Sequence, residues 1–111
     1  MQIVLYLDSM RKISNNLKKF YWSAVVKDIA LHVLKLNWNG IVFDLKVLDN
    51  KAIHELLKII TYRADISLAN MTNKEAIDFI EDIRLILANN GFTLTVDNDE
   101  WERIISEYGE C

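Results

Sequence analysis

Apolar residues alternate with polar ones on both sides of Asn39-Gly40, in the stretch LHVLKLNWNGIVFDLKVLD, residues 31–49. Asparagine and glycine both tolerate positive φ, so the pair predicts a two-residue type I′ turn between antiparallel strands. The turn sets four apolar or aromatic pairs on one face: Trp38 with Ile41, Leu36 with Phe43, Leu34 with Leu45 and His32 with Val47. We expect this face to lie in the core.

The opposite face of the same hairpin supports this register. It places Lys35 across from Asp44, and opposite charges on neighbouring strands attract each other. The alternative is a helix that ends at Asn39 with Gly40 as its left-handed cap. Four apolar residues are spaced to line such a helix: Val25, Val26, Ile29 and Val33. We favour the hairpin, although the sequence leaves residues 23–38 open between helix and strand.

The first predicted helix begins at Asp8 or Ser9. Its apolar stripe consists of Ile13, Leu17, Phe20 and Ala24, with Met10 at the margin. Beyond Trp22 the stripe loses phase, because the next apolar residues fall on other faces. The helix therefore either breaks near Ser23 or is buried on all sides in its second half.

Capping signals predict the next two helices. Asp49 or Asn50 can cap the second helix, whose core-facing residues are Ile53, Leu56, Leu57 and Ile60. The third begins at TNKE, where Thr72 and Glu75 have the spacing of a capping box, and ends with Gly91 as a left-handed cap. Its apolar face contains Ala76, Phe79, Ile80, Ile83, Ile86 and Leu87.

The remaining segments predict one more strand and one more helix. FTLTVD, residues 92–97, alternates as a half-buried strand does, and residues 2–7 are a candidate for a further strand. A last helix starts at Asp97 or Asn98, ends at Gly109, and buries Trp101, Ile104, Ile105 and Tyr108. We therefore expect an α+β fold: a small antiparallel-rich sheet, formed by the hairpin near residues 32–47 and strand 92–97, covered by about four helices.

Length and composition are consistent with a single globular domain spanning residues 1–111. The 111 residues are 51% hydrophobic and include no proline. A chain of this length and hydrophobic content can bury a core without disulfides. The opening MQIVLYLD has no basic region, and its apolar run is far shorter than the ~20 residues that span a bilayer. We expect a cytoplasmic protein without membrane contact.

Residues with catalytic chemistry are scarce. His32 and His54 lack the spacing of a metal site, and we expect His54 to be a solvated residue near a helix N-terminus. Cys111 is the single cysteine, and none of the three glycines lies in a phosphate-binding loop. The sequence thus predicts a protein that is not an enzyme and that uses no metal or cofactor.

Charge is divided unevenly along the chain. Residues 1–35 contain six basic and two acidic residues, a net charge of +4. Residues 75–111 contain two basic and ten acidic residues, a net charge of −8. Such asymmetry influences association rather than the fold.

Helical spacing groups the acidic residues. Asp78, Glu81 and Asp82 fall opposite the apolar face of the third helix, and Leu85 lies among them. Glu100 and Glu107 form a similar stripe on the last helix. These six residues form a predicted partner-binding surface. The alternative is that both acidic faces are only solvated. For Leu85, a further alternative is burial beneath the last helix.

The function that fits these features is a non-enzymatic protein-binding inhibitor, similar in kind to immunity proteins and antitoxins. Its acidic surface would meet a basic partner such as a nuclease toxin domain, because carboxylates can occupy the sites of phosphates. The alternative is a small nucleic-acid-binding module that uses the basic first helix: Arg11, Lys12, Lys18 and Lys19, with Trp22 at its end. We do not expect nucleic acid as the partner, because the acidic half repels phosphate.

Overall fold

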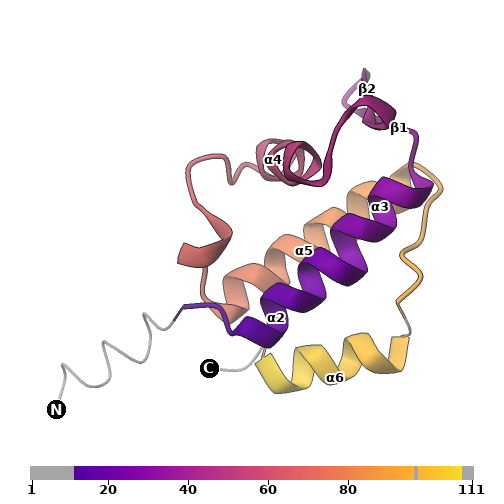
Figure 1. Ribbon diagram of the computed structural model, residues 1–111. Coiled ribbons are helices and arrows are strands. Elements are labelled where there is room, and N and C mark those ends of the chain that lie inside the picture. Colours follow the sequence, from indigo (N-terminus) through magenta and orange to yellow (C-terminus); the bar gives the residue numbers. More distant parts are fainter. Residues whose placement is uncertain (1–11, 97, 109–111) are drawn as a thin grey trace, which may run out of the picture.

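The computed structural model of the protein describes residues 12–96 and 98–108 (Figure 1). Its elements in chain order are α2 (Asn15–Phe20), the π-helical segment η1 (Tyr21–Val26), α3 (Lys27–His32), β1 (Lys35–Trp38), β2 (Ile41–Asp44), the 3-10 turn η2 (Leu45–Val47), α4 (Asn50–Ile60), the 3-10 turn η3 (Leu68–Asn70), α5 (Asn73–Asn89) and α6 (Asn98–Tyr108). The segments α2, η1 and α3 run on without a break, and we call them the N-terminal rod. Counting the rod once, the described residues form four helices and a two-stranded antiparallel sheet, which confirms the predicted α+β class.

The core lies between the helices. Figure 1 shows the N-terminal rod and α5 side by side, with α4 on one side of this pair and α6 on the other. The ring of Tyr21 on the rod lies 5.4 Å from that of Phe79 on α5, and Phe20 stacks at 5.8 Å on Trp101 of α6. Apolar side chains from the rod, α4 and α5 fill the space around these rings: Leu17, Val25, Ile29, Ile53, Leu57, Ile80 and Ile83.

The π-helical segment explains why the apolar stripe of the first helix loses phase. The backbone N–H of Lys27 bonds to the carbonyl of Trp22, five residues earlier, where an α-helix would use the fourth. One extra residue in a turn rotates everything after it by roughly 100° relative to an uninterrupted α-helix. Val25, Val26 and Ile29 are consequently all at 0% exposure. The helix neither breaks near Ser23 nor is buried on all sides, so both alternatives were wrong.

The predicted start of the first helix is also wrong within the described residues. Residues 12–14 are not helical, and the rod begins after Ser14, whose hydroxyl accepts from the Leu17 N–H at 3.1 Å. The N–H of Ile13 instead donates to the carbonyl of Met71 at 2.8 Å, which holds this segment extended beside the start of α5. Asp8, Ser9 and Met10 lie outside the described residues.

The hairpin and its register are confirmed. Asn39 and Gly40 have φ values of 52° and 83°, as a type I′ turn requires, and the helical alternative is wrong because α3 ends at His32. The paired residues are Lys35 with Asp44, Leu36 with Phe43, Asn37 with Val42 and Trp38 with Ile41. The predicted pairing of His32 with Val47 is wrong, since these residues belong to α3 and η2.

The apolar face of the hairpin is only partly buried. Leu36 and Leu45 are in the core, and Trp38 and Phe43 are half-buried against it. Leu34 and Ile41, which we expected in the core, are exposed at opposite ends of the hairpin.

Residues 92–96 form no strand, so the predicted strand 92–97 is wrong over the part that the structure describes; residue 97 and residues 2–7 lie outside it. The backbone N–H and carbonyl of Asn37, on the outer edge of β1, are bonded to the side-chain amide of Asn90 at 2.8 and 3.0 Å. This amide occupies the edge that a third strand would need. The segment packs on the helices instead, with Leu94 buried and the Thr95 N–H donating to Asp28 at 2.8 Å.

The predicted caps of α4 and α5 are confirmed. The Asp49 carboxylate accepts from the Ala52 N–H at 2.8 Å at the start of α4. At the start of α5 the Thr72 hydroxyl accepts from the Glu75 N–H, and the Glu75 carboxylate accepts from the Thr72 N–H. Gly91 follows α5 with a φ of 76°. Within the described residues, no helix combines the length and the apolar character needed to cross a membrane.

The capping box permits a direct stability test. Thr72→Ala should lower the free energy of unfolding by about 1 kcal/mol, because it leaves the N–H of Glu75 without its acceptor. Ser67→Ala is the control, since Ser67 precedes η3 without a side-chain capping bond. Urea denaturation of both variants measures the difference, and equal stabilities would mean that the box does not stabilise α5.

Candidate partner-binding surface

The outer face of α5 exposes the residues that helical spacing placed on it. Leu85 is 64% exposed, although the same helix buries Phe79, Ile80, Ile83 and Leu87 on its opposite side. The carboxylates of Asp78, Glu81 and Asp82 are exposed around it. The alternative in which Leu85 is buried beneath the last helix is therefore wrong.

Each of these carboxylates also has a partner within the chain. Asp82 accepts a hydrogen bond from the guanidinium of Arg63 at 2.8 Å, and Asp78 lies 3.7 Å from the ammonium of Lys74. Arg63 is held in turn by the carbonyl of Thr61 at 3.0 Å. The charge of the face is consequently offset in part within the chain, and among the two aspartates Asp82 is the one that a hydrogen bond holds in place.

Glu81 has a structural role that sequence reasoning missed. Its carboxylate accepts from the indole N–H of Trp101 at 2.6 Å, which links α5 to α6. The Trp101 ring is 4% exposed, stacks on Phe20 and has the guanidinium of Arg84 5.2 Å from its centre. A buried tryptophan needs an acceptor for its N–H, but the sequence alone does not show which helix supplies it.

The second acidic stripe lies on α6. Glu100 and Glu107 flank Arg103, with nitrogen-to-oxygen distances of 4.0 and 3.4 Å. The opposite side of α6 buries Trp101 and Ile104 in the core. The structure thus places all six predicted residues on two adjoining helices, with Glu81 at the junction.

His54 is not the solvated residue that we expected. It is 7% exposed, because α4 turns it toward Tyr21 and Phe79 in the core. Burial, together with the nearby Lys58 ammonium, lowers the pKa of His54, and Glu55 opposes this only in part. Burial and the Glu55 carboxylate raise the pKa of the Tyr21 hydroxyl. A hydrogen bond of 2.7 Å joins Nδ1 of the His54 imidazole to the Tyr21 hydroxyl.

The lowered pKa of His54 makes stability depend on pH. The unfolded chain takes up a proton on this side chain near pH 6.5, before the folded protein does, so stability falls as the pH drops below that value. The slope from one such group is at most about 1.4 kcal/mol per pH unit. Urea denaturation at pH 5.5 and 7.5 should show a smaller loss in His54→Gln than in the wild type. His32→Gln is the control, and an equal loss in all three proteins would contradict the assignment.

The described residues include no group of three or more histidine, cysteine, aspartate and glutamate side chains that could hold a metal ion. His32 lies 3.5 Å from Asp28, and the Asp28 carboxylate also accepts from the Thr95 N–H. Cys111 is outside the described residues.

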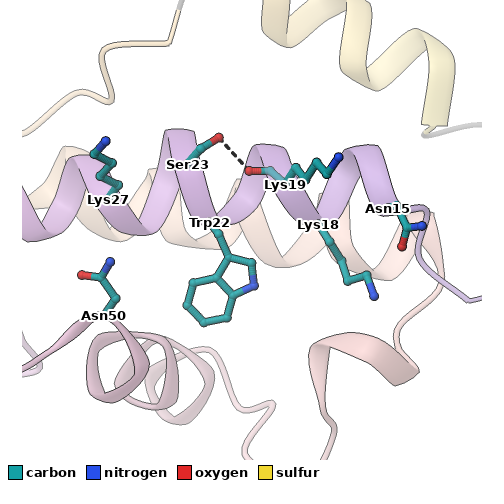
Figure 2. Close-up of a pocket in the computed structure, with 7 residues that line it drawn as sticks. All are labelled: Asn15, Lys18, Lys19, Trp22, Ser23, Lys27 and Asn50. Carbon is teal, nitrogen blue, oxygen red and sulfur yellow. Dashed lines mark hydrogen bonds between the residues drawn. The ribbon is translucent and has the colours of Figure 1, made fainter.

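A groove of about 700 Å³ lies along the N-terminal rod at the start of α4 (Figure 2). It is lined by Lys18, Lys19, Lys27, Trp22, Asn15 and Asn50, with Ser23 at its margin. Figure 2 shows the Trp22 indole and Lys18 on one side of the rod, and Lys19, Ser23 and Lys27 along the other. Sequence reasoning had grouped Lys18, Lys19 and Trp22 on a basic face, but it did not include Lys27 or Asn50.

Of the other two residues of the predicted basic face, Lys12 is exposed before the start of the rod and does not line this groove, and Arg11 lies outside the described residues.

Comparison with known proteins identifies no relative: the chain matches no protein-family model, no curated protein and no solved structure.

Proposed function

We propose that this protein is a non-enzymatic, protein-binding inhibitor of the immunity or antitoxin kind. Its outer α5 face would dock a basic partner such as a nuclease toxin domain. The observation that carries the proposal is Leu85, an apolar side chain at 64% exposure among the carboxylates of Asp78, Glu81 and Asp82. An apolar anchor surrounded by charged groups is a common arrangement in specific protein interfaces.

The fixed carboxylate of Asp82 supports this interpretation. Arg63 binds Oδ2 of Asp82, which leaves Oδ1 to accept from a cation on the partner. A carboxylate that is already held in place loses less side-chain entropy when a partner binds. Asp82 would therefore act as a preorganised acceptor beside the apolar anchor, and Asp78 as a second acceptor on its other side.

The charge of the two helices would attract such a partner. The residues of α5 and α6 include eight acidic and three basic side chains, a net charge of −5. Glu100 and Glu107 would extend the attractive field beyond the contact itself and raise the association rate. The proposed role needs no cofactor, and it places the protein in the cytoplasm.

The kinetics of binding test the proposal. The wild-type chain is immobilised at physiological salt to capture a basic protein, and that protein then serves as the ligand for the variants. Leu85→Ala should raise the dissociation rate about 30-fold, as the loss of a 2 kcal/mol anchor does. Asp78→Asn combined with Asp82→Asn should mainly slow association and weaken its dependence on salt. Surface plasmon resonance resolves the two effects.

Matched controls separate binding from folding. Asp44→Asn combined with Asp65→Asn changes the charge equally at exposed carboxylates outside α5 and α6, and it should leave the kinetics unchanged. Because Leu85 is exposed, Leu85→Ala should alter the free energy of unfolding by no more than about 0.5 kcal/mol. A Leu85→Ala variant that melts early and binds normally would contradict the proposed interface.

A further inference from the structure

We infer that the groove beside Trp22 binds a nucleoside phosphate, a small ligand that combines a planar base with one or more phosphates. This site lies on the N-terminal rod and at the start of α4, whereas the proposed protein interface lies on α5 and α6. The inference therefore goes beyond the proposed inhibitor function and does not depend on it.

No carboxylate among the described residues forms an ion pair with Lys18, Lys19 or Lys27, which all line the groove. Other lysines without such a partner, Lys35, Lys46 and Lys51, do not line it. Three ammonium groups around one groove repel each other and concentrate positive potential there. A bound anion removes this repulsion, and phosphate is the anion whose charge matches several ammonium groups.

The π-helical segment is what brings the third lysine to the groove. Five positions along a regular α-helix would turn Lys27 roughly 140° away from Trp22. The extra residue in η1 reduces this angle to roughly 40°, so that Lys27 lines the groove with Trp22 from the side of the rod that also carries Lys19 and Ser23 (Figure 2). The same segment that keeps Val25 and Val26 in the core therefore also assembles the cationic groove, and π-turns of this kind recur at functional sites.

Trp22 provides a rigid aromatic surface in the groove. Its ring lies 4.8 Å from that of His54 and 5.3 Å from that of Tyr21. His54 is itself fixed by the hydroxyl of Tyr21. The indole is nevertheless only half-buried, and none of the described residues accepts a hydrogen bond from its N–H. Its accessible part can stack on a planar base, which every nucleotide offers.

Polar groups and size complete the match with a nucleotide. The side-chain amides of Asn15 and Asn50 offer both donors and acceptors, as the edge of a base requires. The volume of about 700 Å³ falls within the range of small-ligand sites, roughly 300–1,000 Å³. The net charge of −3 for the whole chain opposes binding of a long phosphate polymer. A free nucleotide therefore fits better than a nucleic-acid strand.

Isothermal titration calorimetry at 150 mM salt tests the inference with ADP, GDP, CDP and UDP, with pyrophosphate and with the parent nucleosides. At least one nucleoside diphosphate should bind saturably with one site per chain. Pyrophosphate and the matching nucleoside should each bind at least 10-fold more weakly, because each contacts only part of the groove. Lys18→Gln combined with Lys19→Gln and Lys27→Gln should weaken both the diphosphate and pyrophosphate at least 10-fold.

Variants of the aromatic surface and two controls complete the test. Trp22→Leu should weaken the diphosphate but leave pyrophosphate unchanged, and Trp22→Phe should restore part of the affinity. Lys19 is exposed, so Lys19→Gln alone should weaken binding several-fold without changing the melting temperature. This variant keeps the test valid even if a Trp22 variant fails to fold. Lys46→Gln on η2 and Leu85→Ala should bind as the wild type does, which separates this site from the protein interface.

Three results would overturn the inference. The first is the absence of saturable binding for all four diphosphates. The second is a triple lysine variant that binds them with wild-type affinity. The third is a ten-residue oligodeoxythymidine that binds more than 10-fold tighter than every diphosphate, since this would assign the groove to a nucleic-acid strand.

Discussion

Insertion of one alanine after Ser23 is expected to lower the free energy of unfolding by about 3–5 kcal/mol. The π-helical segment η1 already accommodates one extra residue, and a second one turns α3 by roughly a further 100° relative to α2. Leu17 and Tyr21 before the segment, and Val26 and Ile29 after it, can then no longer face the core together. Urea denaturation followed by circular dichroism measures the loss.

Ser23→Ala is the matched control for this insertion. It removes only the exposed hydroxyl that donates to the Lys19 carbonyl at 2.6 Å, and it keeps the length of the rod. Its stability should stay within about 0.5 kcal/mol of the wild type. An insertion variant as stable as Ser23→Ala would show that the core does not depend on how α2 and α3 face each other.

Trp101→Ala should have an effect of similar size, a loss of about 3–5 kcal/mol. Trp101 connects three helices, because its ring stacks on Phe20, its face meets Arg84 and its N–H bonds to Glu81. The substitution leaves a cavity where α6 packs and removes its bond to α5. Urea denaturation measures the loss, and hydrogen exchange should report faster exchange in α6 than in α4.

Two conservative variants divide this effect between packing and the hydrogen bond. Trp101→Phe keeps an aromatic ring but lacks the N–H, and Glu81→Gln keeps a side-chain oxygen acceptor for the indole. We expect losses of about 1–2 kcal/mol for the first and less for the second. If Trp101→Ala cost no more than Trp101→Phe, the packing of the indole would not be what holds α6.

Features specified by neighbouring residues could be predicted from the sequence. The turn at Asn39-Gly40 needs two residues that accept positive φ, and the bonds between Thr72 and Glu75 span three positions. The cap at Asp49 is equally local. Each of these elements forms through interactions within a few residues, so the pattern of side chains was sufficient.

Features specified by distant residues could not be predicted. The rod begins later than expected because Ile13 bonds to Met71, 58 positions away. Residues 92–96 form no strand because the side chain of Asn90 occupies the edge of β1 at Asn37. Both depend on contacts between distant segments, which the alternation of hydrophobic and polar residues does not reveal. The phase shift at Trp22 was visible in the sequence, but several backbone geometries could produce it.

The two surfaces differ in the same way. The position of Leu85 among acidic residues follows from the spacing of one helix, and the structure agrees with it. The bonds from Glu81 to Trp101 and from Asp82 to Arg63 join separate elements, and no local signal indicates them. The groove at Trp22 likewise depends on the π-helical segment and on Asn50 of α4.

Photo-crosslinking from position 85 in living cells tests most directly whether the outer face of α5 binds a partner. A photoreactive benzoylphenylalanine replaces Leu85, and in a matched control it replaces Val47, another apolar residue that is exposed, at 76%, on η2. Our account predicts one dominant adduct from position 85, to a protein with a net positive charge, and its absence from position 47. The same adducts from both positions, or none from position 85, would contradict the proposed interface.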